Sequence, residues 1–119
     1  MKTIIAAALM SALAPLCAKS QVTPPAPRRV VYHLYINDTM ANFTGRPRPA
    51  IAINGSIPGP ELYFTEGDTA EIHVHNSLGT ETSVHWHGLI LPNRYDGVSY
   101  LTTAPIKARS THTFEFPIV

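Results

Sequence analysis

Cysteine is nearly absent from this chain of 119 residues, which has a single one, Cys17. Cys17 lies in an N-terminal segment that we expect to be removed, so the mature chain is predicted to have no disulfide and no thiolate metal ligand. This excludes a small domain stapled by disulfides. It also excludes an electron-transfer site of the blue-copper type, which needs a cysteine beside its histidines.

The N-terminal segment has the pattern of a secretory signal peptide. Lys2 supplies a positive charge, residues 3–16 are almost wholly apolar, and small residues precede Gln21. The apolar run is too short and wrongly flanked for a membrane span. We therefore expect residues 1–20 to be a signal peptide, residues 21–29 to be a proline-rich arm, and the protein to be exported to the periplasm or secreted.

Charged residues are also few, at 14% of the chain, and neither sign dominates. Nine lysines and arginines stand against eight aspartates and glutamates, and removal of Lys2 and Lys19 with the signal peptide leaves seven against eight, a net charge of −1. A nucleic-acid partner calls for a clustered basic surface. The composition therefore disfavours a nucleic-acid-binding function.

Helical patterns are absent after the signal peptide, whereas short runs of β-branched and aromatic residues recur between Gly, Pro and Asn residues. The alternation of apolar and polar residues in these runs predicts strands. The predicted strands are 30–38, 50–53, 61–65, 69–76, 82–91 and 111–116. A set of short strands with turn signals between them predicts an all-β, antiparallel Greek-key β-sandwich.

The clearest functional pattern lies in the predicted strand 82–91 and reads Ser-Val-His-Trp-His-Gly over residues 83–88. Successive side chains of a strand point to opposite faces, so His85 and His87 are expected to share one face, with Cα atoms about 6.6 Å apart. Trp86 then points into the core. Neutral imidazoles bind copper, zinc, iron and nickel, so the pair alone does not choose among these metals. We expect His85 and His87 to be metal ligands.

A second His-x-His pair, His73 and His75, lies in the predicted strand 69–76. The apolar residues of this strand alternate inward, so the two histidines share the opposite face with Glu71. The simplest interpretation is a solvated outer face rather than a metal site. His33 is likewise interpreted as a strand-face residue, because no partner for it is near in the sequence.

Further motifs accompany the His-Trp-His pattern at fixed order and spacing. They are Asn-Gly-Ser-Ile-Pro-Gly-Pro at 54–60, Glu-Gly-Asp-Thr at 66–69, Thr-Ser-Val-His-Trp-His-Gly-Leu at 82–89, Asp-Gly-Val at 96–98 and Pro-Ile at 105–106. Together they resemble the first cupredoxin, or plastocyanin-like, domain of the multicopper oxidases, a family that includes laccases and periplasmic copper-resistance oxidases. The resemblance covers residues 30–119 and implies a cupredoxin-like β-sandwich.

The resemblance implies a chemistry of four coppers, in which a trinuclear cluster reduces dioxygen to water while a phenol, cuprous ion or another metal is oxidised. His85 then corresponds to a ligand of the cluster's type-2 copper, and His87 to a ligand of one type-3 copper. Asp96, nine residues beyond His87, corresponds to an acid that helps deliver protons to reduced oxygen. A plain Asp-Gly turn is the alternative interpretation of Asp96.

The resemblance also implies ligands that this chain does not contain. Another His-x-His pair, which binds the cluster in this family, would lie beyond Val119. The cysteine of the mononuclear copper would lie there too, in C-terminal cupredoxin domains. We therefore expect a truncated N-terminal domain, inactive as an oxidase by itself. A non-catalytic copper-binding module and a cupin-like metal protein are the alternatives, although the cupin motif needs a glutamate where Leu91 and Pro92 stand.

Overall fold

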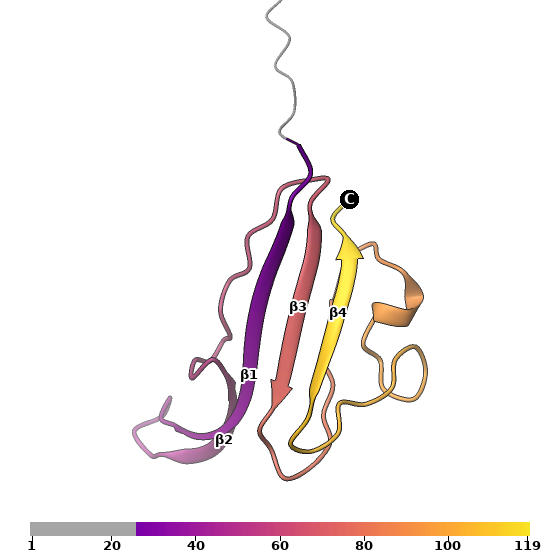
Figure 1. Cartoon of the computed structure of the whole chain (residues 1–119). Coiled ribbons are helices and arrows are strands. Elements are labelled where there is room, and N and C mark those ends of the chain that lie inside the picture. The colour runs from indigo at the N-terminus through magenta and orange to yellow at the C-terminus, as the bar shows by residue number, and fades with distance from the viewer. Residues whose placement is uncertain (1–25) are drawn as a thin grey trace, which may run out of the picture.

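The computed structural model describes residues 26–119, so the predicted signal peptide and most of the proline-rich arm lie outside the described residues. Four strands form one sheet (Figure 1), namely β1 Arg29–Ala41, β2 Arg48–Ile53, β3 Thr69–Asn76 and β4 Thr111–Pro117. Their order across the sheet is β2-β1-β3-β4. β1 pairs antiparallel with β2 and parallel with β3, and β3 pairs antiparallel with β4. The all-β class is confirmed, but the expected antiparallel pairing is not complete, because β1 and β3 run parallel.

Helical structure within residues 26–119 is limited to the 3-10 helix η1, Asn93–Tyr95. This part of the chain has no helix with the length and hydropathy that crossing a bilayer requires.

The alternating pattern of the strands gives the sheet one apolar face. β3 alternates strictly, with Ala70, Ile72 and Val74 fully buried. The same face of β1 and β4 and two residues of the connecting segments complete the core. Its members are Leu34, Ile36, Ala70, Ile72, Val74, Leu78, Ile106, Phe114 and Phe116. Burying one large side chain of this kind contributes roughly 1.5–3 kcal/mol, so this face supplies much of the driving force for folding.

Two of the predicted strands are not formed. Residues 61–65 have no ladder partner, and residues 82–91 have only an isolated bridge between Thr82 and Ile106. Both segments instead pack against the apolar face of the sheet, through Leu62, Phe64, Val84, Trp86 and Leu91. Alternating burial looks the same in a sequence whether or not a neighbouring strand accepts the backbone hydrogen bonds. The described residues thus contain one sheet of the expected sandwich, covered by connecting segments.

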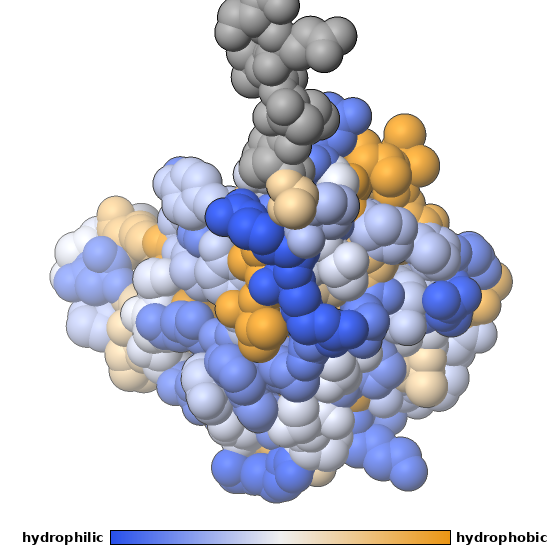
Figure 2. Space-filling model, turned by 45° about the horizontal axis from the view of Figure 1, so that its top comes forward, coloured by the Kyte–Doolittle hydropathy of each residue, from blue (hydrophilic) through white to orange (hydrophobic). Residues whose placement is uncertain are grey.

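The surface is mixed rather than uniformly polar. Figure 2 shows hydrophilic residues over most of one view, with separate apolar patches between them. The most exposed of the large apolar side chains are Ile90 and Leu101, at 82% and 80%. Both follow the His-Trp-His motif in the chain, so the segments after this motif contribute exposed apolar surface.

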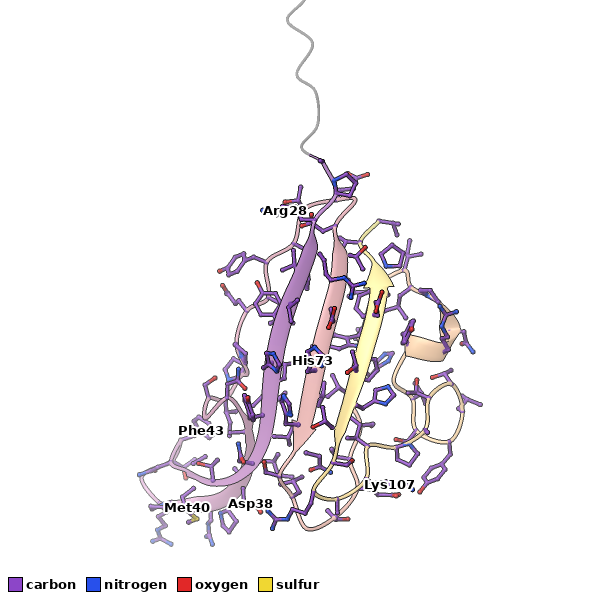
Figure 3. The ribbon with its side chains drawn as sticks, viewed as in Figure 1. Arg28, Asp38, Met40, Phe43, His73 and Lys107 are labelled. Atoms are coloured by element: carbon purple, nitrogen blue, oxygen red, sulfur yellow. The ribbon has the colours of Figure 1, made fainter. Side chains whose placement is uncertain are left out.

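A buried carboxylate closes the turn before β3. Asp68 is only 2% exposed, and its Oδ2 accepts hydrogen bonds from the Thr65 backbone N–H at 2.8 Å and from Arg28 Nη2 at 3.1 Å. Figure 3 labels Arg28 just before the start of β1. The Arg28 side chain, followed by the Thr65 N–H, lowers the pKa of Asp68 below its ordinary value. The carboxylate therefore ties the N-terminal end of β1 to the turn that starts β3.

The pKa of Asp68 predicts how stability depends on pH. The pKa of Asp68 is lower in the folded chain than in the unfolded one. The ionised carboxylate therefore stabilises the fold fully above the unfolded pKa, about 4, and this stabilisation is lost as pH falls through the folded pKa. In the parent chain the melting temperature is expected to fall as pH drops below about 5. In Asp68→Asn this fall is expected to be smaller. Asp38→Asn, at an exposed position of β1, is the matched control. Equal acid transitions for Asp68→Asn and the parent chain would contradict the prediction.

Candidate metal centre

The His-Trp-His motif lies in an extended segment that leaves the sheet after the bridge at Thr82. Burial alternates along it as the sequence predicts, because His85 and His87 are exposed whereas Trp86 is half-buried. The segment ends in a turn in which the Leu89 N–H donates to the Trp86 carbonyl at 3.2 Å, and Gly88 has a φ of +82°. The expected side-chain directions therefore hold without the expected strand.

Trp86 anchors the motif to the core. Its ring contacts Phe114 edge to face, with centroids 5.3 Å apart, and it contacts Phe116 at 5.7 Å. Trp86 Nε1 is buried and has no hydrogen-bond partner among the described residues. Aromatic pairs of this geometry contribute about 0.5–1.5 kcal/mol each beyond their buried area. The indole thus holds the backbone of the two histidines against β4.

The two imidazoles of the motif lie next to each other on the outside of this segment. The ring centroids of His85 and His87 are 5.5 Å apart, and the ring planes cross at 73°. The His85 side chain is 40% exposed, so a metal ion in solution can reach the pair without a change in the fold.

Asp96 contacts His85 directly, although the two are eleven positions apart in the chain. The backbone carbonyl of Asp96 lies 2.6 Å from His85 Nδ1. A carbonyl oxygen can only accept, so Nδ1 carries the proton and Nε2 keeps its lone pair. Metal-binding histidines commonly donate their other ring N–H to such an acceptor, which fixes the tautomer. The Asp96 carboxylate is 3.6 Å from the same nitrogen.

Gly97 is the reason why Asp96 can come so close. Its φ is +82°, and a Cβ there would overlap the carbonyl oxygen of Val84 and lie 3.0 Å from His85 Cα. The Thr103 hydroxyl secures the same loop, because it accepts from the Gly97 N–H at 2.9 Å and donates to the Arg94 carbonyl at 3.0 Å. The roles of Gly97 and Thr103 were not predicted, and the only signal in the sequence is the Asp-Gly turn at 96–97.

The imidazoles of His85 and His87 are donors that fit copper. Each side chain offers an imidazole ring, and the Nδ1 of one of them, His85, is hydrogen-bonded to a backbone acceptor, which suits a divalent transition metal. Among residues 26–119, however, no three or more His, Cys, Asp or Glu side chains lie together in a way that could hold a metal ion. Within these residues, the pair therefore offers a metal ion two imidazole donors.

The second His-x-His pair lies on the outer face of the sheet, as predicted. His73 Nε2 is 2.8 Å from Glu71 Oε1, and His75 Nδ1 is 2.8 Å from Thr111 Oγ1. His33 lies on the exposed face of β1, as interpreted, but the reason given for this, that it has no partner, does not hold. The parallel pairing of β1 with β3 places His33 opposite His73, and its Nδ1 is 2.9 Å from His75 Nε2.

Comparisons with known proteins agree with the fold and the motif. The family model described as multicopper oxidase matches residues 35–119. Copper resistance protein A of Pseudomonas syringae pv. tomato is 45% identical over 87 residues, which are 73% of this chain and 14% of that protein. Laccase-1 of Botryotinia fuckeliana is 40% identical over 88 residues, which are 71% of this chain and 16% of that protein. The crystal structure of a laccase from Botrytis aclada superposes with a TM-score of 0.73 at 36% identity, covering 79% of this chain and 18% of that chain.

The class that these observations define is a cupredoxin-like all-β domain, the class of the matching oxidase domains. The chain belongs to the multicopper oxidase family. Membership implies copper as the cofactor at the level of the family. The chain spans 14% of the length of the copper resistance protein A relatives that it matches.

Proposed function

We propose that His85 and His87 are copper ligands of a multicopper oxidase and supply two of the imidazoles of a trinuclear copper cluster. Copper, when bound, supplies the one-electron steps by which dioxygen is reduced to water and a phenol, cuprous ion or another metal substrate is oxidised. The hydrogen bond from His85 Nδ1 to the Asp96 carbonyl, at 2.6 Å, carries the proposal. It leaves the Nε2 lone pair of His85 available for a metal, beside the ring of His87.

Asp96 is proposed to hold a proton near this cluster. Its carboxylate Oδ1 lies 3.6 Å from His85 Nδ1, and its side chain is 30% exposed, so the carboxylate can exchange protons with water and still face the site. The two parts of Asp96 then have separate roles. The backbone carbonyl orients His85, whereas the carboxyl group takes up a proton from water and passes it on.

Residues 30–119 are proposed to belong to an N-terminal plastocyanin-like domain, with the other cluster ligands in further cupredoxin domains of the same exported protein. An apolar surface beside the motif supports this arrangement. A cavity there is lined by Leu89, Ile90, Phe116, Pro117, Ile118 and Val119. Ile90 is largely exposed, and exposed apolar surface of this kind commonly marks a protein contact.

Copper titration of the 119-residue chain tests the assignment of the ligands. Substoichiometric Cu(II) is expected to broaden the imidazole NMR signals of His85 and His87, because a paramagnetic ion at the pair lies against both rings. His87→Ala is expected to weaken this site by at least about tenfold, since even an outer partner of a metal ligand is worth about 10–100-fold in affinity. Met40→Leu, at an exposed thioether on β1, is the control. An unchanged affinity in His87→Ala would refute the assignment.

A non-catalytic copper-binding module is the second candidate, favoured by the lack of any three-ligand group within residues 26–119. Oxygen consumption separates the two candidates. In the complete protein, His87→Ala is expected to abolish oxygen reduction if the oxidase proposal holds, whereas a binding module consumes no oxygen in either form. The 119-residue chain by itself is expected to consume none with phenols or cuprous ion, because two imidazoles are only part of a cluster.

A further inference from the structure

The loop of residues 97–103 follows Asp96 and lies outside the sheet (Figure 1). It is closed on itself by hydrogen bonds between its two ends. The Val98 carbonyl accepts from the Thr102 N–H at 3.0 Å, and the Thr102 hydroxyl accepts from the Val98 N–H at 3.1 Å. These hydrogen bonds fix the shape of the loop, but they do not fix its place against the rest of the chain.

Tyr100, in the middle of this loop, has a backbone conformation that a large side chain disfavours. Its φ is +63°, and such an outlier persists only where the surrounding structure holds it. Burial of the ring does not account for it, because Tyr100 is 78% exposed. The side chain instead makes a polar contact, since its hydroxyl donates a hydrogen bond to Glu81 Oε1.

Glu81 lies four positions before His85 in the segment that carries the His-Trp-His motif. Asp96 contacts His85 just before the loop begins, and Tyr100 contacts Glu81 from the middle of the loop. Among residues 26–119, no other hydrogen bond joins residues 97–103 to this segment. The hydrogen bond between Tyr100 and Glu81 is therefore placed to hold the loop beside the motif.

This hydrogen bond joins a phenol to a carboxylate. Hydrogen bonds to a carboxylate are roughly twice as strong as those between neutral groups. The hydrogen bond to Glu81 also raises the pKa of Tyr100, so the phenol keeps its proton and can donate. Because both side chains are exposed to competing water, we expect loss of the hydrogen bond to shift the equilibrium between a closed and an open loop by about two- to tenfold.

We propose that Tyr100 is a positioning residue for His85. Through Glu81 it keeps the loop against the segment of the histidines, and the closed loop keeps the Asp96 carbonyl at His85 Nδ1. An open loop withdraws this acceptor, so the ring proton of His85 is no longer confined to Nδ1 and the lone pair is no longer confined to Nε2. The inference rests on the proposed function only for its consequence, which is tighter binding of copper by His85.

Tyr100→Phe in the 119-residue chain tests this positioning without a metal. The change removes only an exposed hydroxyl, so the sheet is expected to fold as before. The ¹⁵N shifts of His85 are expected to move toward those of a mixture of tautomers. The nuclear Overhauser effect between the α protons of Gly97 and His85 is expected to weaken, because Gly97 lies against the His85 backbone in the closed loop. Unchanged ¹⁵N shifts of His85 would overturn the proposal.

Changes at Glu81 test whether the acceptor is required. Glu81→Ala is expected to reproduce the ¹⁵N shifts of Tyr100→Phe, and the double variant is expected to add nothing further, because both changes remove the same hydrogen bond. Glu81→Gln keeps an acceptor oxygen and is expected to keep the parent tautomer of His85. Additive effects of Glu81→Ala and Tyr100→Phe would contradict a shared hydrogen bond.

Tyr63→Phe is the matched control. Tyr63 is also exposed, at 71%, and its hydroxyl donates to a glutamate, Glu61, outside the loop of residues 97–103. Tyr63→Phe is expected to leave the ¹⁵N shifts of His85 unchanged. An equal effect of Tyr63→Phe and Tyr100→Phe on His85 would refute the positioning role.

Titration with a Cu(II) salt measures the consequence for metal binding. Cu(II) affinity at His85 and His87 is expected to fall by at least about twofold in Tyr100→Phe and to stay at the parent value in Tyr63→Phe. Direct outer partners of a metal ligand are worth about 10–100-fold, and Tyr100 acts through one further contact. A parent chain that binds no Cu(II) at His85 would refute the proposed function, whereas the ¹⁵N shifts of His85 would still decide the role of Tyr100. A parent chain that binds Cu(II) with the same affinity as Tyr100→Phe would overturn the proposal.

Discussion

Gly97→Ala is expected to destabilise the chain by about 2–5 kcal/mol and to break the contact between Asp96 and His85. A residue with a Cβ pays about 1–2 kcal/mol for a left-handed backbone, and Gly97 has a φ of +82°. The added Cβ would also overlap the carbonyl oxygen of Val84. Overpacking costs about 1–3 kcal/mol more, because backbone atoms cannot turn aside as a side chain can.

Gly45→Ala is the matched control for this prediction. Gly45 has nearly the same φ, +83°, but a Cβ there has no atom within 4 Å, so only the backbone term of about 1–2 kcal/mol applies. Urea unfolding gives both free energies, and the ¹⁵N shifts of His85 report whether its Nδ1 proton still has an acceptor. Equal free energies of unfolding for Gly97→Ala and Gly45→Ala, with an unchanged His85 tautomer, would contradict the close packing of Gly97 against Val84 and His85.

Asn76→Ala is expected to lower the free energy of unfolding by about 3–5 kcal/mol, because the buried amide of Asn76 forms hydrogen bonds with four backbone groups. The Asn76 residue is 2% exposed. The two hydrogens of its Nδ2 are shared among three carbonyls, those of Thr80, Ile106 and Lys107, at 2.9, 3.1 and 3.0 Å. Its Oδ1 accepts from the Leu78 N–H at 3.0 Å. Each group left buried without a partner costs about 1–3 kcal/mol, and the loops only partly relax to water.

Asn76→Ala is also expected to weaken copper binding at His85 and His87. Ile106 pairs with Thr82 at the isolated bridge from which the His-Trp-His segment starts, so release of Ile106 frees that segment. Asn37→Ala is the control, since Asn37 makes only a long hydrogen bond to the Tyr35 carbonyl, at 3.4 Å, and is expected to change stability by less than about 0.5 kcal/mol. Thermal unfolding of both variants, with copper titration of Asn76→Ala, measures the two effects. A decrease in the free energy of unfolding of less than about 1 kcal/mol in Asn76→Ala would contradict the structural role of this amide.

The alternation of side chains was predictable wherever a strong pattern of period two exists. The sequence predicted β3 to the residue, and it predicted β1, β2 and β4 with shorter bounds than the structure has. It also predicted the inward direction of Trp86 between two outward histidines. Periodicity reports which side of an extended segment is buried. It does not report whether a neighbouring backbone is present, and for this reason residues 61–65 and 82–91 were expected as strands.

What the sequence by itself determined is the set of local chemical choices. These are the apolar face of each strand, the two imidazoles of His85 and His87 on one side of a segment, and the family to which the ordered motifs belong. Only the tertiary structure decided which residues meet across strands and loops. The contact of Asp96 with His85 depends on a loop that closes over eleven residues, and the meeting of His33 with His75 depends on a parallel register over 42 residues. The physical reason is that side-chain direction follows from a period of two along one strand, whereas register follows from long-range packing and backbone pairing, which no single segment contains.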